Sequence, residues 1–132
     1  TYNPQMTKGK PIHGRKVNHT AGNFKNRCYG GFHMTEPKIT DEKYPISVLN
    51  FDKEWKDWYH PTQKPVDLLM WLIKTYSNEG EVVLDNAAGS MSTAIAAIST
   101  NRKCICIEKD ENFFNIGKER VENYLHEIKK EG

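Results

Sequence analysis

EVVLDNAAGSMST, residues 81–93, is the stretch that decides the fold. Its apolar run, residues 82–84, is too short for a helix and predicts a buried strand of a parallel sheet. The strand ends at the carboxylate of Asp85, and a loop of small residues leads into Ser/Thr-rich helical sequence. Ligands of open parallel sheets bind beyond the carboxyl ends of the strands, next to helix N-termini. The stretch therefore predicts a nucleotide-type ligand site at this edge.

The sequence before this strand predicts a turn followed by a helix. Pro61 and Pro65 bracket the turn, and Pro65 suits the first position of a helix, where its missing N–H costs nothing. Apolar residues then recur at helical spacing in one stripe, and Gly80 is expected to stop the helix. The stripe consists of Val66, Leu69, Leu72, Ile73 and Tyr76.

The sequence after the loop predicts a helix, a second strand and a last helix. A small-residue helix should begin at Ser90 or Met91, and residues 103–108 (KCICIE) indicate a second buried strand that ends in Glu108. Asp110 should cap the last helix. This alternation predicts the α/β class with a parallel sheet, although two strands are too few for a complete sheet. The two strand-end carboxylates should then flank one crevice and accept hydrogen bonds from hydroxyl or amino groups.

Residues 1–58 predict a different, loop-rich segment. They hold four of the six prolines and ten Lys/Arg against six Asp/Glu, and residues 44–51 are the best strand candidate. Trp58 and Tyr59, like Trp55, should pack at a domain edge rather than stack on bases. Residues 1–35 carry six basic side chains and no acidic one, which suits a polyanionic partner or, equally, a solvated arm. The basic residues are Lys8, Lys10, Arg15, Lys16, Lys25 and Arg27.

Cysteine usage and hydropathy point to a cytoplasmic protein. Three cysteines give an odd count, which indicates a reducing compartment and no disulfide framework. Cys104 and Cys106 should share one strand face as core residues, because no second pair completes a zinc site. No apolar run approaches the roughly 18 residues that span a membrane, and TYNP is not the start of a signal peptide. Neither a metal nor a membrane partner is expected.

Three ordered blocks carry a resemblance to a known family. HPTQKP (60–65), VLDNAAGSMST (83–93) and ICIEKDENFF (105–114) lie within a run from His60 to about Tyr124. This run resembles the carboxyl half of the site-specific DNA amino-methyltransferases in which the S-adenosylmethionine motif follows the catalytic motif. The resemblance implies a partial Rossmann-like methyltransferase core over residues 59–132, and a preceding target-recognition segment over residues 1–58.

The resemblance also implies roles for individual residues. Thr62, Gln63 and Lys64 would line the methionine end of the cofactor, Asp85 and Gly89 would approach its sulfonium and amino groups, and Glu108 would hold the ribose. The full set implied for cofactor binding is Thr62, Gln63, Lys64, Asp85, Asn86, Gly89, Ser90 and Glu108. The partner implied for the basic residues of the front segment is double-stranded DNA, through its phosphates.

The chain departs from the family pattern in two places. Met91 stands where the family usually has a second glycine, so either the thioether weakens the cofactor site or it points into helix packing. No two prolines are adjacent, so the Pro-Pro block that holds a flipped base during methyl transfer is not in this sequence. No catalytic residue is therefore assigned.

Three functional hypotheses follow. The chain is the carboxyl part of an adenine-specific methyltransferase, inactive until an upstream segment or second polypeptide supplies the catalytic block. Alternatively, it is a non-catalytic DNA-binding or cofactor-binding remnant. The third hypothesis, an unrelated parallel-sheet domain, is disfavoured by the three ordered blocks.

Overall fold

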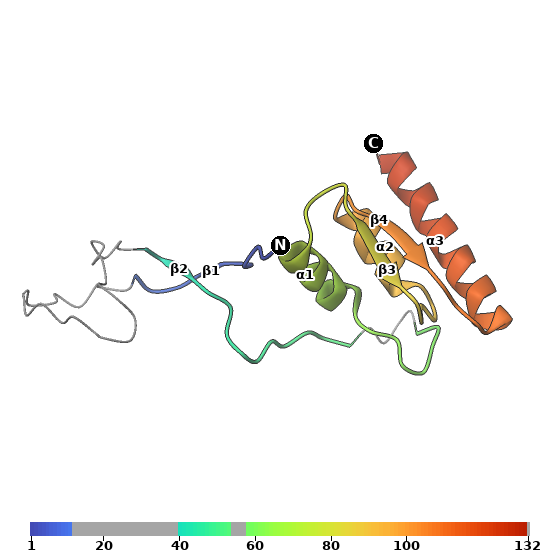
Figure 1. Ribbon diagram of the computed structural model, residues 1–132, viewed down its shortest axis with the longest axis horizontal. Coiled ribbons are helices and arrows are strands. Elements are labelled where there is room, and N and C mark those ends of the chain that lie inside the picture. The colour runs from blue at the N-terminus through green and yellow to red at the C-terminus, as the bar shows by residue number, and fades with distance from the viewer. Residues whose placement is uncertain (12–39, 54–57, 132) are drawn as a thin grey trace, which may run out of the picture. The chain divides into compact units, whose positions relative to one another are not determined.

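The computed structural model describes residues 1–11, 40–53 and 58–131 (Figure 1). The chain divides into two compact units: Met6–Tyr44, and Thr1–Gln5 together with Pro45–Gly132. Within the described residues, each unit contains one two-stranded sheet. The division into functional segments at residue 58 stays a prediction.

The larger unit is built on two parallel strands, as expected. Strand β3 (Val82–Asp85) pairs with β4 (Lys103–Cys106) so that Val82 lies opposite Lys103 and Asp85 opposite Cys106. Helix α2 (Ser92–Ser99) connects them, α1 (Val66–Tyr76) precedes them and α3 (Glu111–Glu131) follows. Backbone hydrogen bonds continue beyond the strands, from Ile107 N to Asp85 O (2.8 Å). The α/β class with a parallel sheet is confirmed.

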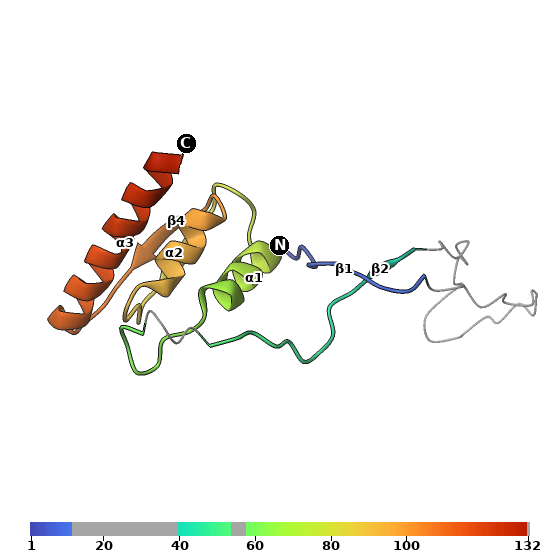
Figure 2. The same cartoon turned by 180° about the vertical axis from the view of Figure 1, so that it is seen from behind.

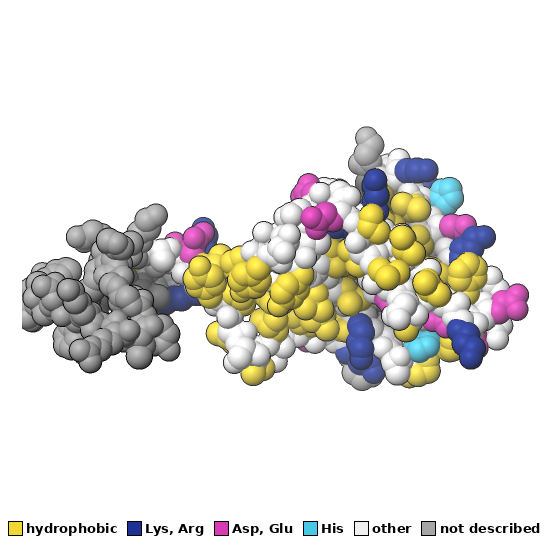
Figure 3. Space-filling view, in the orientation of Figure 1, with side chains coloured by type: hydrophobic (Ala, Val, Ile, Leu, Met, Phe, Trp, Pro, Cys, Tyr) yellow, Lys and Arg dark blue, Asp and Glu magenta, His cyan; other side chains and the backbone are white. Residues whose placement is uncertain are grey.

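The three helices cover one face of this sheet. Ile73 of α1 and Ala97 of α2 pack with Val83 and Cys104, and Val121 of α3 packs near Cys106. Figure 2 shows α2 in front of the strands, whereas Figure 1 views their other face. On that other face four apolar side chains are 53–63% exposed, and Figure 3 shows apolar groups gathered over β3 and β4. They are Val82, Leu84, Ile105 and Ile107.

The expectation that both strands are buried is therefore wrong for one face. An apolar run predicts burial on both sides only when layers exist on both sides. Among the described residues, no element lies over the second face, and alternate side chains of each strand are exposed there.

Helix α1 differs from its prediction in detail. Pro65 is the N-cap with ψ 134°, so the helix begins one residue later at Val66. Leu72 and Tyr76 are exposed, whereas Met70 packs against the core cluster. The helix ends at Tyr76, where Ser77 N–H bonds to Ile73 O (3.0 Å). Gly80 has a positive φ of 81° in the turn that follows, so it shapes the turn instead of stopping the helix.

The strand expected over residues 44–51 is not formed. Its backbone has no partner strand among the described residues, and Ile46 is 73% exposed. Side chains alternate along this stretch after Pro45, but a strand also needs a neighbour for its backbone hydrogen bonds. At the other end of this unit, Asn3 N–H bonds to Thr75 O (2.7 Å), which fixes residues 1–5 to α1.

The smaller unit contains an antiparallel pair. Strand β1 (Thr7–Lys8) pairs with β2 (Glu42–Lys43), and Gly9 N–H donates to Asp41 O (2.7 Å). Lys8 and Lys10 are exposed, as phosphate-binding side chains must be. Four further candidates for DNA binding lie outside the described residues, as do Cys28 and Trp55. They are Arg15, Lys16, Lys25 and Arg27.

None of the helices in the described ranges is long and apolar enough to cross a bilayer.

Candidate cofactor site

The end of β3 organises the loop that follows it. Asp85 Oδ1 accepts a hydrogen bond from Ala87 N (3.1 Å), and Oδ2 accepts one from Thr93 Oγ1 (2.6 Å). The carboxylate therefore ties the start of the loop to the first turn of α2. Asn86 and Ala87 are exposed at the edge of the sheet, whereas the next residues of the loop turn inward and are buried.

The end of β4 meets the same loop. Glu108 Oε2 accepts a hydrogen bond from Gly89 N (2.6 Å), and Oε1 accepts one from Asp110 N (2.9 Å). These backbone donors, Asp110 first and then Gly89, lower the pKa of the Glu108 carboxyl, which stays ionised and accessible. The structure thus brings Glu108 to the loop that Asp85 shapes, as expected for neighbouring parallel strands.

Gly89 lies in a tight place that favours glycine. Its φ is +51°, and an added Cβ would lie 3.4 Å from the ring of His60. The His60 ring in turn packs edge-on against Phe113, with centroids 4.1 Å apart. The turn His60–Pro65 is therefore held against both the loop and the start of α3. His60 therefore has a structural role in joining these elements.

The three polar residues of this turn differ in their contacts. Gln63 Oε1 accepts hydrogen bonds from Ser90 Oγ (2.9 Å) and Tyr59 N (3.0 Å), so Gln63 joins the turn to the loop. Thr62 N donates to His60 Nδ1 (3.2 Å) within the turn. Lys64 is exposed. Ser90 is 3% exposed, and its hydroxyl donates to Gln63. The hydroxyl is therefore used to hold the loop against the turn.

Met91 points into the protein. It is the N-cap of α2 in the left-handed conformation (φ 57°, ψ 34°), which glycine adopts at least cost. Its side chain is buried with Ala88 and Ala94. Gly117 of α3 makes room for it, since a Cβ there would lie 2.7 Å from Met91 Cγ. Of the two readings of Met91, packing is the one that the structure supports.

The two strand cysteines are core residues, as expected. Their sulfurs lie 3.3 Å apart on the covered face. Burial raises the pKa of both thiols, that of Cys106 to about 12. Among the described residues, no three His, Cys, Asp or Glu side chains gather as metal ligands.

The structure corrects the expectation that Trp58 and Tyr59 pack at a domain edge. Trp58 is 56% exposed and Tyr59 is 43% exposed. The Trp58 ring faces the Lys53 ammonium at 5.1 Å, and the Tyr59 ring faces the Arg120 guanidinium at 5.2 Å. Both rings therefore contact cations, which a count of apolar residues does not reveal.

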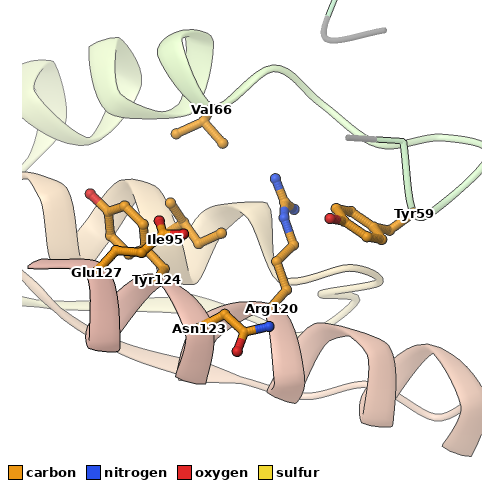
Figure 4. A pocket seen from close by; sticks show the side chains of 7 residues that line it. All are labelled: Tyr59, Val66, Ile95, Arg120, Asn123, Tyr124 and Glu127. Atoms are coloured by element: carbon orange, nitrogen blue, oxygen red, sulfur yellow. The ribbon is translucent and has the colours of Figure 1, made fainter. Parts of the chain in front are cut away.

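A pocket of about 380 Å³ lies where side chains from α1, α2 and α3 converge (Figure 4). Arg120 extends from α3 into it, with the Tyr59 ring at its side. The lining residues are Tyr59, Val66, Ile95, Arg120, Asn123, Tyr124 and Glu127.

The geometry defines an α/β unit with carboxylate acceptors at two adjacent strand ends and a tight glycine between them. Residues 10–119 match the model of the DNA methylase family (N6_N4_Mtase). The chain belongs to this family.

Individual relatives agree. DNA adenine methyltransferase YhdJ of Escherichia coli is 42% identical over 91 residues, which are 64% of this chain and 30% of that enzyme. Type II methyltransferase M2.MboI of Moraxella bovis is 32% identical over 100 residues, 65% of this chain and 37% of that enzyme. The chain thus spans about a third of these relatives.

A solved structure shares the fold. The M1.HpyAVI–SAM complex superposes with a TM-score of 0.52 at 30% identity, covering 66% of this chain and 42% of that one. That neighbour was crystallised with S-adenosylmethionine (SAM), and its fold supports the Rossmann-like description of the larger unit.

Proposed function

We propose that this chain is the cofactor-binding part of a SAM-dependent DNA methyltransferase acting on the adenine amino group. The single observation that carries the proposal is the Glu108–Gly89 contact of 2.6 Å, because it joins the end of one strand to the loop at the end of the other. A nucleoside with hydroxyl and amino donors needs such an edge lined by acceptors.

The residues present fit that cofactor. The Glu108 carboxylate uses one lone pair on each oxygen for the backbone, which leaves acceptor capacity for ribose hydroxyls. Asp85 lies at the neighbouring strand end and provides negative charge for an amino or sulfonium group. Asn86, Thr62 and Lys64 are exposed and are proposed to touch the ligand directly. When bound, SAM would supply the electrophilic methyl group.

Other proposed cofactor residues act through the loop. Gln63 and Ser90 engage each other, so we assign them to holding the loop, whereas Gly89 provides the close backbone approach. The Met91 side chain is buried in the packing of α2 against α3, so its presence in the loop does not argue for a non-catalytic remnant.

The catalytic and DNA-binding parts of the proposal rest on sequence. Because the chain holds no adjacent prolines, methyl transfer requires a Pro-Pro block from an upstream segment or a second polypeptide. The open face of β3 and β4 supports this idea, since parallel sheets are normally covered on both sides. Residues 8–27 are proposed to bind DNA phosphates in the cytoplasm.

Calorimetry with SAM tests the cofactor proposal. The chain should bind at millimolar SAM or below with a thermal shift, Glu108→Gln and Asp85→Ala should abolish binding, and Glu122→Gln should leave it intact. Glu122 is a suitable control because it is an exposed carboxylate on α3 paired with Lys118 (4.0 Å). Absence of both heat and thermal shift in the wild-type chain would overturn the proposal.

A further inference from the structure

Helix α3 contacts the loop between β3 and α2 through the side chain of Arg120. We propose, resting on the function proposed above, that Arg120 is a positioning residue that clamps residues 90–92 and thereby sets the affinity for SAM. The clamp is defined by five residues: Arg120, Ser90, Ser92, Gln63 and Tyr59.

The first half of the clamp is a pair of hydrogen bonds from one nitrogen. Arg120 Nη1 donates to Ser90 O (3.1 Å) and to Ser92 Oγ (2.8 Å). These acceptors lie on either side of Met91, the left-handed residue where the loop becomes helix α2. Both serines are buried, so a charged donor is worth more to them than it would be in water. Arg120 therefore stabilises the backbone conformation that a non-glycine residue at position 91 disfavours.

The second half returns from the loop to Arg120. Ser90 Oγ donates to Gln63 Oε1, which also accepts the Tyr59 N–H. The Tyr59 ring lies over the guanidinium at 5.2 Å, and Figure 4 shows the two side chains next to each other. The contacts form a closed ring through the turn, the loop and α3. Loosening any member removes one of the contacts that hold the loop to the turn or to α3.

This ring does not touch the carboxylates of Asp85 and Glu108, yet it affects the hydrogen bond that Glu108 accepts from the loop. Gly89 precedes Ser90 and donates to Glu108, so a displaced Ser90 carries the Gly89 N–H away from the carboxylate. An arginine suits the task because its planar group stacks on Tyr59 and still donates, whereas a lysine ammonium offers a point charge. Pre-organisation of this kind raises affinity by reducing the ordering cost of binding.

The experiment uses the whole chain and two readouts. SAM affinity is measured by calorimetry, and amide hydrogen exchange of Gly89 and Met91 is measured without ligand. Arg120→Ala should weaken SAM binding about tenfold, as expected for a charged hydrogen bond, and speed exchange at both amides. Arg120→Lys should recover part of the loss, and Tyr59→Leu should cost less than Arg120→Ala. Lys118→Ala, an exposed cation on the same helix, is the matched control and should change neither.

The outcomes separate this inference from the proposed function. If wild type binds SAM and Arg120→Ala binds within about twofold of it, well short of the loss expected for a charged hydrogen bond, the clamp is overturned. If wild type does not bind, the proposed function fails, and unchanged exchange of the two amides then overturns the clamp independently. A merely structural role would lower the melting temperature and raise exchange throughout α2, including Ala97. Should Arg120→Ala not fold, Arg120→Lys and Tyr59→Leu decide by the same two readouts.

Discussion

The two faces of the β3–β4 sheet differ although their strands are the same. Val83, Cys104 and Cys106 point to helices α1, α2 and α3, where small alanines bring α2 close to the strands. Val82, Leu84, Ile105 and Ile107 are equally apolar but stay exposed. One face therefore contributes to the core of this chain and the other does not.

The difference teaches that both faces of the strands have the apolar composition of buried faces, although the described residues cover only one of them. Four contiguous apolar side chains on two strands are typical of a surface that another layer covers. This agrees with a chain that spans about a third of its relatives. Matched substitutions on the two faces make the comparison measurable.

The largest effect is expected for a charge placed on the covered face. Val83→Asp should lower the free energy of unfolding by about 3 kcal/mol, because a carboxylate without a partner is forced beneath the helices. Leu84→Asp, one residue along the same strand, should change it by less than about 0.5 kcal/mol, the range of surface substitutions. Urea denaturation measures both. Equal losses would show that the second face is also covered in solution.

A moderate effect is expected where α3 meets the loop. Gly117→Ala should destabilise the chain by about 1 kcal/mol, since crowding against Met91 and Gly89 O outweighs the gain in helix propensity. In a Met91→Ala background the same change should cost less or stabilise. Asn115→Ala, exposed in α3, controls for propensity. Thermal unfolding measures the two single variants and the double variant. If the losses of stability from Gly117→Ala and Met91→Ala simply added, this packing would be contradicted.

The smallest effect concerns thiol chemistry on the two faces. At pH 8, Cys106 should react with an alkylating reagent at least about tenfold more slowly than the thiol introduced on the exposed face by Ile105→Cys, because burial suppresses the Cys106 thiolate. Peptide mapping by mass spectrometry distinguishes the sites, and comparable rates would contradict the burial of Cys106.

The raised pKa of Cys106 also sets the direction in which the stability of the folded state changes with pH. The neutral Cys106 thiol favours the folded state below pH 9.0, and this contribution is lost as the pH rises toward about 12.

Much of the larger unit could be predicted because its signals are local. The order of helices and strands follows from short apolar runs and helical spacing, and the Asp110 cap is confirmed by hydrogen bonds to Asn112 N (2.9 Å) and Phe113 N (3.0 Å). The strand expected at 44–51 failed because its formation depends on a partner, which alternation cannot reveal. Trp58 and Tyr59 were misjudged because cations, not core residues, lie against them.

The sequence by itself determined the α/β order, the acidic ends of β3 and β4, and their meeting at one edge, since parallel neighbours must end together. Only the tertiary structure decided which strand face is covered, where Met91 points, and that Arg120 reaches Ser90. Ser90 and Arg120 are 30 residues apart in sequence. Contacts of that range depend on how helices pack, and local sequence patterns do not encode them directly.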